Sequence, residues 1–146
     1  MALHLEQREL ELPARARGFH DVTGALRSCV AEWGIERGLL NVFLKHTSAS
    51  LVINENADPQ VLRDLEAFAQ RLVPDGDGLF EHTAEGPDDM PAHVRTALTA
   101  TSLQLPIAGG RLALGTWQAV YLWEHRTAPH TRRLLLSAVG EHPTHD

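Results

Sequence analysis

The last third of the chain restricts the possible fold most, because it is dense in strand-forming residues. Four apolar segments follow one another there and are separated by short turn-like sequences. Their sequences are LQLPI, RLALG, WQAVYLWEHR and TRRLLLSAVG, with the turn AGG between the first two. Short connections join antiparallel neighbours, so this region predicts hairpin-connected antiparallel strands.

The first two thirds mix further strands with three helical patterns. Asp21 and Asp58 stand where helix caps are expected, Gly34 stands where a helix would end, and Pro74 stops the second helix. The second helix is expected to bury Val61, Leu62, Leu65, Phe68, Ala69 and Leu72. Expected helices cover residues 22–33, 59–73 and 91–101, and expected strands cover residues 4–12, 39–46 and 50–54. We therefore expect an α+β fold, mainly an antiparallel β-sandwich with about three helices, in one domain over residues 1–146.

Composition excludes several classes of partner. With 13 basic and 19 acidic residues the net charge is −6, which argues against a nucleic-acid partner. The single cysteine, Cys29, permits no intrachain disulfide and no cysteine-based metal site, and it lies on a helical apolar stripe where burial is expected. Without a signal peptide or a membrane-spanning stretch, the expected location is the cytoplasm, with no membrane partner.

Polar side chains gather where the expected elements begin or end, which is where a scaffold can direct them into a shared cleft. Histidine and carboxylate side chains of this kind suit Zn, Mn, Fe or Ni. No histidine pair has the i, i+4 spacing of HExxH. The clusters are His46-Thr47-Ser48, residues 54–58, His82 with His93, and Gln118 with Glu124-His125.

Each cluster also has a purely structural interpretation. Asp58 is better explained as a helix cap than as a ligand, and His93 is equally well explained as a surface residue. Neighbouring residues on a strand point to opposite faces, so Glu124 shares a face with Gln118 and not with His125.

Two further segments have a pattern of their own. Trp117, Tyr121 and Trp123 share one strand face, which favours core packing or a subunit interface. Residues 74–91 are rich in Gly, Pro and Asp and too long for a simple connection, which is typical of a functional or mobile loop.

The runs HTSASLVINENADP, EGPDDMPAHVRTAL, PIAGGRLALGTWQAVYLWEHR and LLLSAVGE closely resemble the YjbQ-like family. The likeness extends from about Leu5 to Glu141. It implies an α+β fold built around a β-sandwich and assembled as a homotrimer. Members of this family carry the label secondary thiamine-phosphate synthase. That reaction joins hydroxymethylpyrimidine diphosphate to thiazole phosphate and releases pyrophosphate.

On this resemblance the first hypothesis is a metal-dependent enzyme acting on a small phosphorylated metabolite. A divalent ion, Zn or Mg/Mn, would be held by His46, His82 and His93. Glu55 or Glu124 would serve as ligand or base, and Ser48 and Gln118 would orient the substrate. The substrate-binding residues would be Asn54, Asp58 and Arg126.

Two other hypotheses remain open. Few basic residues lie near the motifs, and no glycine-rich phosphate cradle is present, which fits a side activity or a non-catalytic trimer that binds a small anion or a metal. A purely structural trimer would instead use the polar motifs as caps and turns. Under the first hypothesis, the polar ends of residues 46–59 form two edges of one site.

Overall fold

The computed structural model describes residues 2–143. Helices and strands follow one another along the chain in an order that begins and ends with long strands. They are β1 (Leu3–Arg15), β2 (Gly18–Asp21), α1 (Thr23–Trp33), β3 (Arg37–Leu44), β4 (Ala49–Glu55), α2 (Pro59–Leu72), α3 (Asp89–Leu98), β5 (Ser102–Ala108), β6 (Arg111–Leu112), β7 (Gln118–Glu124) and β8 (His130–Glu141).

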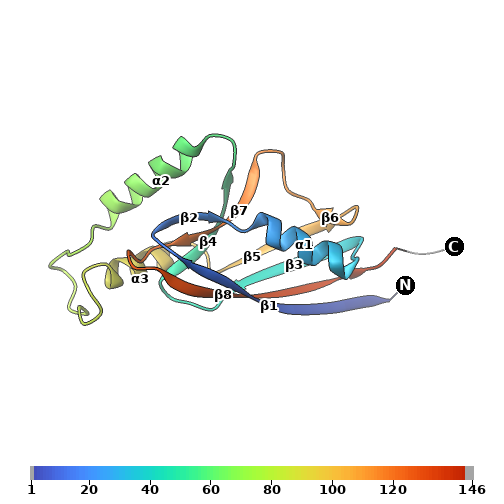
Figure 1. Cartoon of the computed structure of the whole chain (residues 1–146), viewed down its shortest axis with the longest axis horizontal. Coiled ribbons are helices and arrows are strands. Elements are labelled where there is room, and N and C mark those ends of the chain that lie inside the picture. The colour runs from blue at the N-terminus through green and yellow to red at the C-terminus, as the bar shows by residue number, and fades with distance from the viewer. Residues whose placement is uncertain (1, 144–146) are drawn as a thin grey trace.

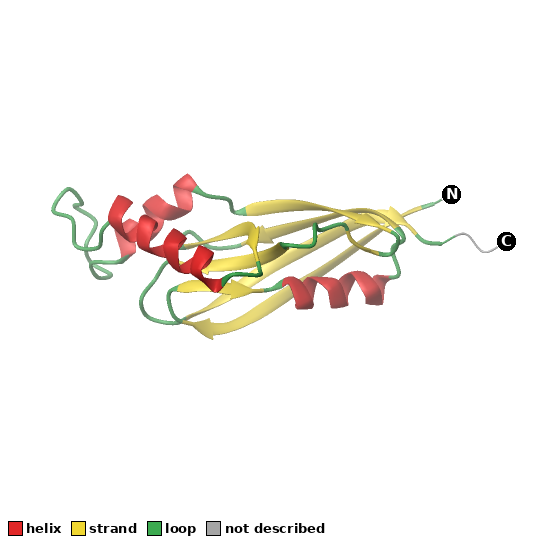
Figure 2. Ribbon diagram, turned by 90° about the horizontal axis from the view of Figure 1, so that it is seen from above, coloured by secondary structure: helices red, strands yellow, loops and turns green. Residues whose placement is uncertain are grey.

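The strands form two antiparallel sheets. One has five strands in the order β1-β8-β3-β5-β6, and the other has three in the order β2-β7-β4. The helices lie outside these sheets, with α1 running along one side and α2 and α3 gathered at the opposite end (Figures 1 and 2). The α+β class with a mainly antiparallel β-sandwich and three helices is confirmed.

The core lies between the two sheets and α1. Leu134 and Leu136 of β8 lie beside Leu44 and Val42 of β3 on the inner face of the larger sheet, and they share the core with apolar residues of β7. Cys29 is buried in this core, as its helical position predicts. Because burial of apolar surface drives folding, the alternation in β8 sets which face of the larger sheet turns inward.

The predicted ends of α2 are confirmed, but its predicted buried face is wrong. Asp58 caps it by accepting a hydrogen bond from the Gln60 backbone nitrogen at 2.9 Å. Of the six apolar residues expected to be buried, just Ala69 is, and Phe68 is 63% exposed. The reason is placement: α2 stands at the edge of the molecule over the three-stranded sheet instead of against the apolar core (Figure 1).

Other boundaries also differ from the sequence-based expectation. Strand β2 was not expected; it forms because its backbone pairs with β7, with Phe19 opposite Trp123 and stacked on it. Helix α3 begins at Asp89, two residues before the expected start at Pro91. Of the three aromatic residues thought to share one face, Tyr121 and Trp123 are buried, whereas Trp117 precedes β7 and is exposed.

Within residues 2–143, no helix has both the length and the apolar character needed to cross a membrane.

Candidate functional site

Three side chains around the start of α3 form the candidate metal site. The Nε2 atoms of His82 and His93 lie 2.9 Å and 3.3 Å from the same oxygen, Oδ2 of Asp89. One possible ligand atom from each of the three residues lies within 4.8 Å of the other two. The Asp89 side chain is 3% exposed, against 53% for His82 and 33% for His93, so the group has a buried carboxylate and an open side.

Local structure explains why these three residues meet. Asp89 and His93 are four residues apart in α3, and this spacing places both on one helix face. His82 comes from the preceding loop, which is closed by a hydrogen bond from the Gly76 nitrogen to the Pro87 carbonyl at 3.0 Å. Gly76 and Gly86 have φ values of 72° and 107°, which permit the tight turns that bring the loop back to α3.

The donor set fits a divalent transition metal. Two imidazole nitrogens and one carboxylate oxygen are the three protein ligands typical of catalytic zinc and of non-haem iron sites, which keep further positions open. The exposure of both histidines leaves room for such positions. His82, Asp89 and His93 are therefore the residues that would hold the ion.

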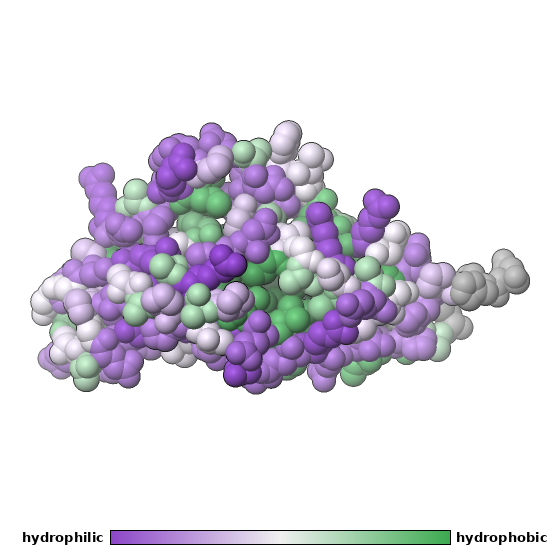
Figure 3. Space-filling model, viewed as in Figure 1, coloured by the Kyte–Doolittle hydropathy of each residue, from purple (hydrophilic) through white to green (hydrophobic). Residues whose placement is uncertain are grey.

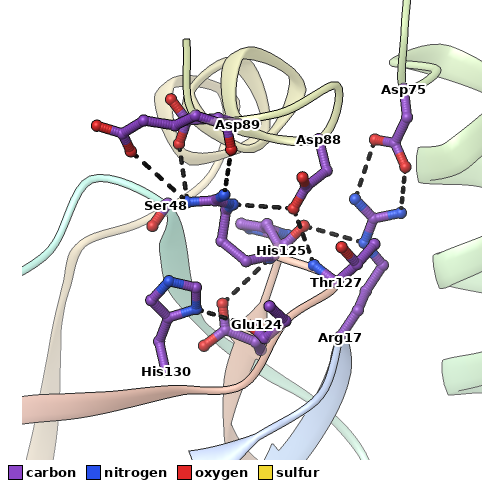
Figure 4. A network of polar contacts seen from close by, with 12 residues as sticks. Arg17, Ser48, Asp75, Asp88, Asp89, Glu124, His125, Thr127 and His130 are labelled. Atoms are coloured by element: carbon purple, nitrogen blue, oxygen red, sulfur yellow. Dashed lines mark hydrogen bonds and ion pairs between the residues drawn. The ribbon is translucent and has the colours of Figure 1, made fainter. Parts of the chain in front are cut away.

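Arg126, which follows β7, holds the carboxylates at the start of α3 in place. Its Nε donates to Oδ2 of Asp88 at 2.8 Å, its Nη1 lies 3.0 Å from Oδ1 of Asp89, and its Nη2 donates to the Glu85 carbonyl at 2.9 Å (Figure 4). Because Arg126 binds Oδ1 of Asp89, the other oxygen, Oδ2, faces the two histidines. Partners of this outer kind orient metal ligands.

The pKa of Asp88 reflects the same arrangement. Burial raises it, but the hydrogen bonds from Arg126 and from the Thr127 backbone nitrogen outweigh burial and lower the pKa to about 2. Asp88 is therefore a carboxylate at neutral pH and anchors Arg126 beside Asp89.

A cavity of about 360 Å³ adjoins His82 in the loop of residues 76–91. Its wall is largely apolar, with Phe80, Met90 and Pro91 among the lining side chains. An apolar cavity beside a group of polar ligands is typical of a site that binds the organic part of a small molecule.

Ser48 and Glu124, predicted to be catalytic, lie together at one end of the smaller sheet. Glu124 is buried and binds Arg132 through both oxygens, with Arg132 Nε donating to Oε2 at 2.7 Å. Nη2 of Arg132 also donates to Oγ of Ser48 at 2.9 Å. Glu124 is thus engaged in a buried ion pair and Ser48 in a hydrogen bond to the same arginine, and their catalytic roles stay predictions.

Four other predicted residues lie at the opposite end of the same sheet. The register pairs Glu55 with Gln118, whereas Glu124 pairs with Ala49. Strand β4 has seven residues, so its two ends lie about 20 Å apart. Within one chain, the polar ends of residues 46–59 are therefore not edges of one site.

Local hydrogen bonds occupy these four residues. Asn54 Oδ1 accepts from the Glu55 nitrogen, and Glu55 Oε2 accepts from the Asp58 nitrogen. Gln118 Oε1 accepts from the Gly115 nitrogen at 2.8 Å. Catalytic roles for Glu55 and Gln118, and substrate-binding roles for Asn54 and Asp58, stay predictions.

His46, the third predicted metal ligand, is outside the group formed by His82, Asp89 and His93. Its Nε2 accepts a hydrogen bond from the Arg133 backbone nitrogen at 2.8 Å. Burial lowers the pKa of His46, and the charge of Arg132 lowers it further. The imidazole is thus held neutral as an acceptor.

Sequence reasoning missed Asp89, the ligand that joins the two histidines. The sequence does contain a signal for it, the Asp-x-x-x-His spacing in DMPAH. This is the same helical i, i+4 spacing that HExxH uses, here between an aspartate and a histidine. It also assigned Arg126 to substrate, whereas the structure places its guanidinium group against Asp88 and Asp89.

The two sheets, the three peripheral helices and the histidine–carboxylate group define a small α+β protein with a candidate metal centre at one end. The sequence model described as UPF0047 protein YjbQ-like matches residues 8–141, and the chain belongs to this family.

Relatives and solved structures agree with this membership. The chain is 48% identical to the UPF0047 protein sll1880 of Synechocystis over 135 residues, which are 92% of each chain. It is 46% identical to the UPF0047 protein YjbQ of Escherichia coli O157:H7, covering 92% of this chain and 98% of that one. A hypothetical protein of Aeropyrum pernix superposes with a TM-score of 0.84 at 31% identity, covering 93% of this chain and 99% of that one.

Proposed function

We propose that this protein is a metal-dependent enzyme whose metal centre consists of His82, Asp89 and His93. The observation that carries this proposal is the approach of both histidine Nε2 atoms to one oxygen of a buried carboxylate. The nitrogen-rich donor set favours a zinc-like ion over Mg²⁺, which prefers oxygen ligands. Bound there, a divalent ion would act as a Lewis acid toward a phosphate or other anionic oxygen.

The residues around this group would supply positioning. Arg126 orients Asp89, so its part in the proposed function is to hold a ligand and not to bind the substrate directly. The apolar cavity beside His82 would receive the organic ring of a substrate.

The named activity that we propose is thiamine-phosphate synthesis, at least as a side activity. A bond from the pyrimidine methylene carbon to diphosphate breaks, a bond from that carbon to the thiazole nitrogen forms, and pyrophosphate leaves. Support comes from family membership and from a cavity able to hold an aromatic ring next to a candidate metal centre. The small phosphorylated metabolite is therefore the expected partner of this cavity.

The second candidate is a non-catalytic protein that binds a metal or a small anion. It is favoured by the state of Glu124, the buried acid in the motif, because both of its oxygens bind Arg132 and neither is free to act as a base. The two candidates share the metal centre and differ in turnover.

We also propose a homotrimer, in which the outer face of the five-stranded sheet packs against another copy. Leu5, Val139 and Leu39 are register neighbours across three strands and are all exposed on that face. A contiguous exposed apolar row of this kind marks an interaction site. Sedimentation should give three times the chain mass, and Leu39→Lys should lower it, whereas Gln70→Lys on the outside of α2 should not.

Metal content tests the proposed centre directly. Untagged protein should retain about one divalent ion per chain, and His93→Ala should lose it, while the control His20→Ala, at a half-buried histidine outside this group, should keep it. His46→Ala distinguishes one-chain from shared sites: retention of metal supports a site within one chain, and loss supports completion by a neighbouring subunit. A metal-free wild type after incubation with Zn²⁺ and Mn²⁺ would contradict the proposal.

Turnover distinguishes the two candidate functions. The metal-loaded protein should release pyrophosphate from the pyrimidine diphosphate when thiazole phosphate is present, and His93→Ala should abolish that release. Metal binding without pyrophosphate release would support the non-catalytic candidate.

A further inference from the structure

A second polar group lies beneath α2, separate from the candidate metal ligands. Five buried side-chain nitrogen and oxygen atoms in residues 2–143 have no hydrogen-bond partner, and all belong to four residues. They are Oε1 of Glu66, Nε and Nη2 of Arg95, Nε1 of Trp123, and Nδ1 of His125. Buried polar atoms in folded proteins nearly always have partners, so their concentration in one place requires an explanation.

Contacts place these four residues next to one another between α2, α3 and the end of β7. Arg95 Nη1 donates to Oε2 of Glu66 at 3.0 Å, and the rings of Trp123 and His125 lie 4.9 Å apart. Arg95 is close enough to His125 for its charge to lower the histidine pKa. The Arg95 residue is 3% exposed and His125 is fully buried.

The two free nitrogens of Arg95, Nε and Nη2, are the pair through which an arginine side chain can bind two oxygens of one anion. Arg132 uses the same two atoms, Nε and Nη2, to bind both oxygens of Glu124. In Arg95 this pair has no partner among residues 2–143, and it is Nη1 that donates to Glu66. A guanidinium edge of this kind suits a carboxylate or phosphate with two parallel hydrogen bonds.

The aromatic neighbours of Arg95 supply further hydrogen-bond donors. The indole Nε1 of Trp123 can only donate. Nε2 of His125 lies 2.8 Å from the Ser50 hydroxyl, and when that hydroxyl donates, Nδ1 carries the hydrogen and is a donor as well. Glu66 Oε1 is the one acceptor in the group.

We propose that Arg95, Glu66, Trp123 and His125 form a binding site for inorganic phosphate. Three phosphate oxygens accept from Arg95, Trp123 and His125. The fourth shares one hydrogen with Glu66, which a phosphate hydroxyl provides and a carboxylate ligand does not. This assignment does not depend on the metal centre or on the proposed activity.

Helix α2 carries Glu66 and covers this group of residues. Helix α2 buries just one of its own residues, Ala69, and apolar atoms show between it and the body of the molecule (Figure 3). Arg17 borders the group, donating from Nε to the His125 carbonyl at 2.9 Å and pairing with Asp75 through both Nη atoms (Figure 4). All three guanidinium nitrogens of Arg17 thus have partners, whereas Arg95 keeps two nitrogens without one among residues 2–143.

Calorimetric titration of the full chain with inorganic phosphate tests the proposal. Wild type should bind, and Arg95→Lys should weaken binding about tenfold or more, because a lysine keeps the charge without the two-nitrogen edge. Trp123→Phe should weaken binding through loss of the indole N–H while keeping an aromatic ring. The exposed Arg63→Lys on α2 should bind as wild type does.

Three outcomes would overturn the proposal. They are no binding to the wild type at millimolar phosphate, unchanged affinity in Trp123→Phe, and equal affinity for acetate. His93→Ala should still bind phosphate. If His93→Ala loses phosphate binding while Arg95→Lys keeps it, the anion binds at the metal centre instead. If Arg95→Lys does not fold, Trp123→Phe and Glu66→Gln decide, and both must weaken binding.

Discussion

Asp89 and His93 lie one turn apart on α3, and Oδ2 of Asp89 is 3.3 Å from Nε2 of His93. The same oxygen is 2.9 Å from Nε2 of His82, while Oδ1 of Asp89 faces Arg126. One carboxylate therefore joins the loop of residues 76–88, helix α3 and the end of β7. This connection makes the candidate metal centre and the local fold depend on each other.

Replacing Asp89 with Asn should weaken metal binding by at least tenfold. The substitution keeps the side-chain shape but removes the charge that both the ion and Arg126 require. Equilibrium dialysis with Zn²⁺ measures the change. Asp64→Asn, on the exposed surface of α2, is the matched control and should bind as the wild type does. Equal affinity in the two variants would remove Asp89 from the ligand set.

Replacing Arg132 with Met should destabilise the fold by about 3–5 kcal/mol. The change leaves the buried carboxylate of Glu124 without its partner, and an unpaired buried charge is costly. Urea unfolding measures the loss. Arg133→Met is the control at the next position, where the side chain is 49% exposed and the expected change is about 1 kcal/mol or less. Similar losses in both variants would contradict the structural role given to Arg132.

Stability should fall between pH 6.5 and 4.5 because of His125. Burial, together with the charges of Arg95 and Arg17, lowers its pKa to about 3 in the folded chain. The unfolded chain keeps an ordinary histidine pKa of about 6.5 and takes up a proton first as the pH drops. The stabilising contribution is thus complete above pH 6.5 and is lost progressively toward pH 3.

The variant His125→Asn removes this titration. Between pH 6.5 and 4.5 the wild type should lose about 2–3 kcal/mol more than the variant, from about 1.4 kcal/mol for each pH unit. Urea unfolding at the two pH values measures the difference, with His20→Ala, at a half-buried histidine, as the control. Parallel losses in wild type and His125→Asn would refute the buried neutral state.

Replacing Gly38 with Ala should cost about 2–3 kcal/mol. A Cβ atom there would stand 2.1 Å from the Val139 carbonyl oxygen, where β3 and β8 bring Gly38 opposite Gly140. Gly24→Ala in α1 is the control, since nothing lies within 4 Å of its Cβ and helix propensity favours alanine by about 0.5–1 kcal/mol. The midpoint temperature of thermal unfolding should fall in Gly38→Ala and rise in Gly24→Ala.

Local signals predicted much of the fold. Gly34 ends α1 with a φ of 66°, and Asp58 caps α2, because both effects depend on a few adjacent residues. The strand β2 was missed because its four residues form a strand through pairing with β7, which is distant in the chain. For the same reason the exposure of Phe68 was not foreseen: periodicity defines a helix face but not what lies opposite it.

The candidate site, like the fold, was predicted only where local signals were enough. The pair His82 and His93 was predicted from residue type and position at element boundaries, but the carboxylate that joins them was not. His82 and His93 meet through Asp89, whereas His46 accepts from the Arg133 backbone. Glu124, expected to serve as a metal ligand or base, pairs with Arg132 inside the protein.

By itself the sequence determined the strand and helix periodicity, the end of α1, both ends of α2 and the class of side chains available for chemistry, since these depend on neighbours along the chain. Tertiary structure alone decided which carboxylate met which cation. Arg126, Arg132 and Arg95 are equal as sequence letters, yet Arg126 orients Asp89, Arg132 neutralises Glu124 and Arg95 keeps two buried nitrogens free. Charge pairing is decided by distance and burial, and both are set when separate segments pack together.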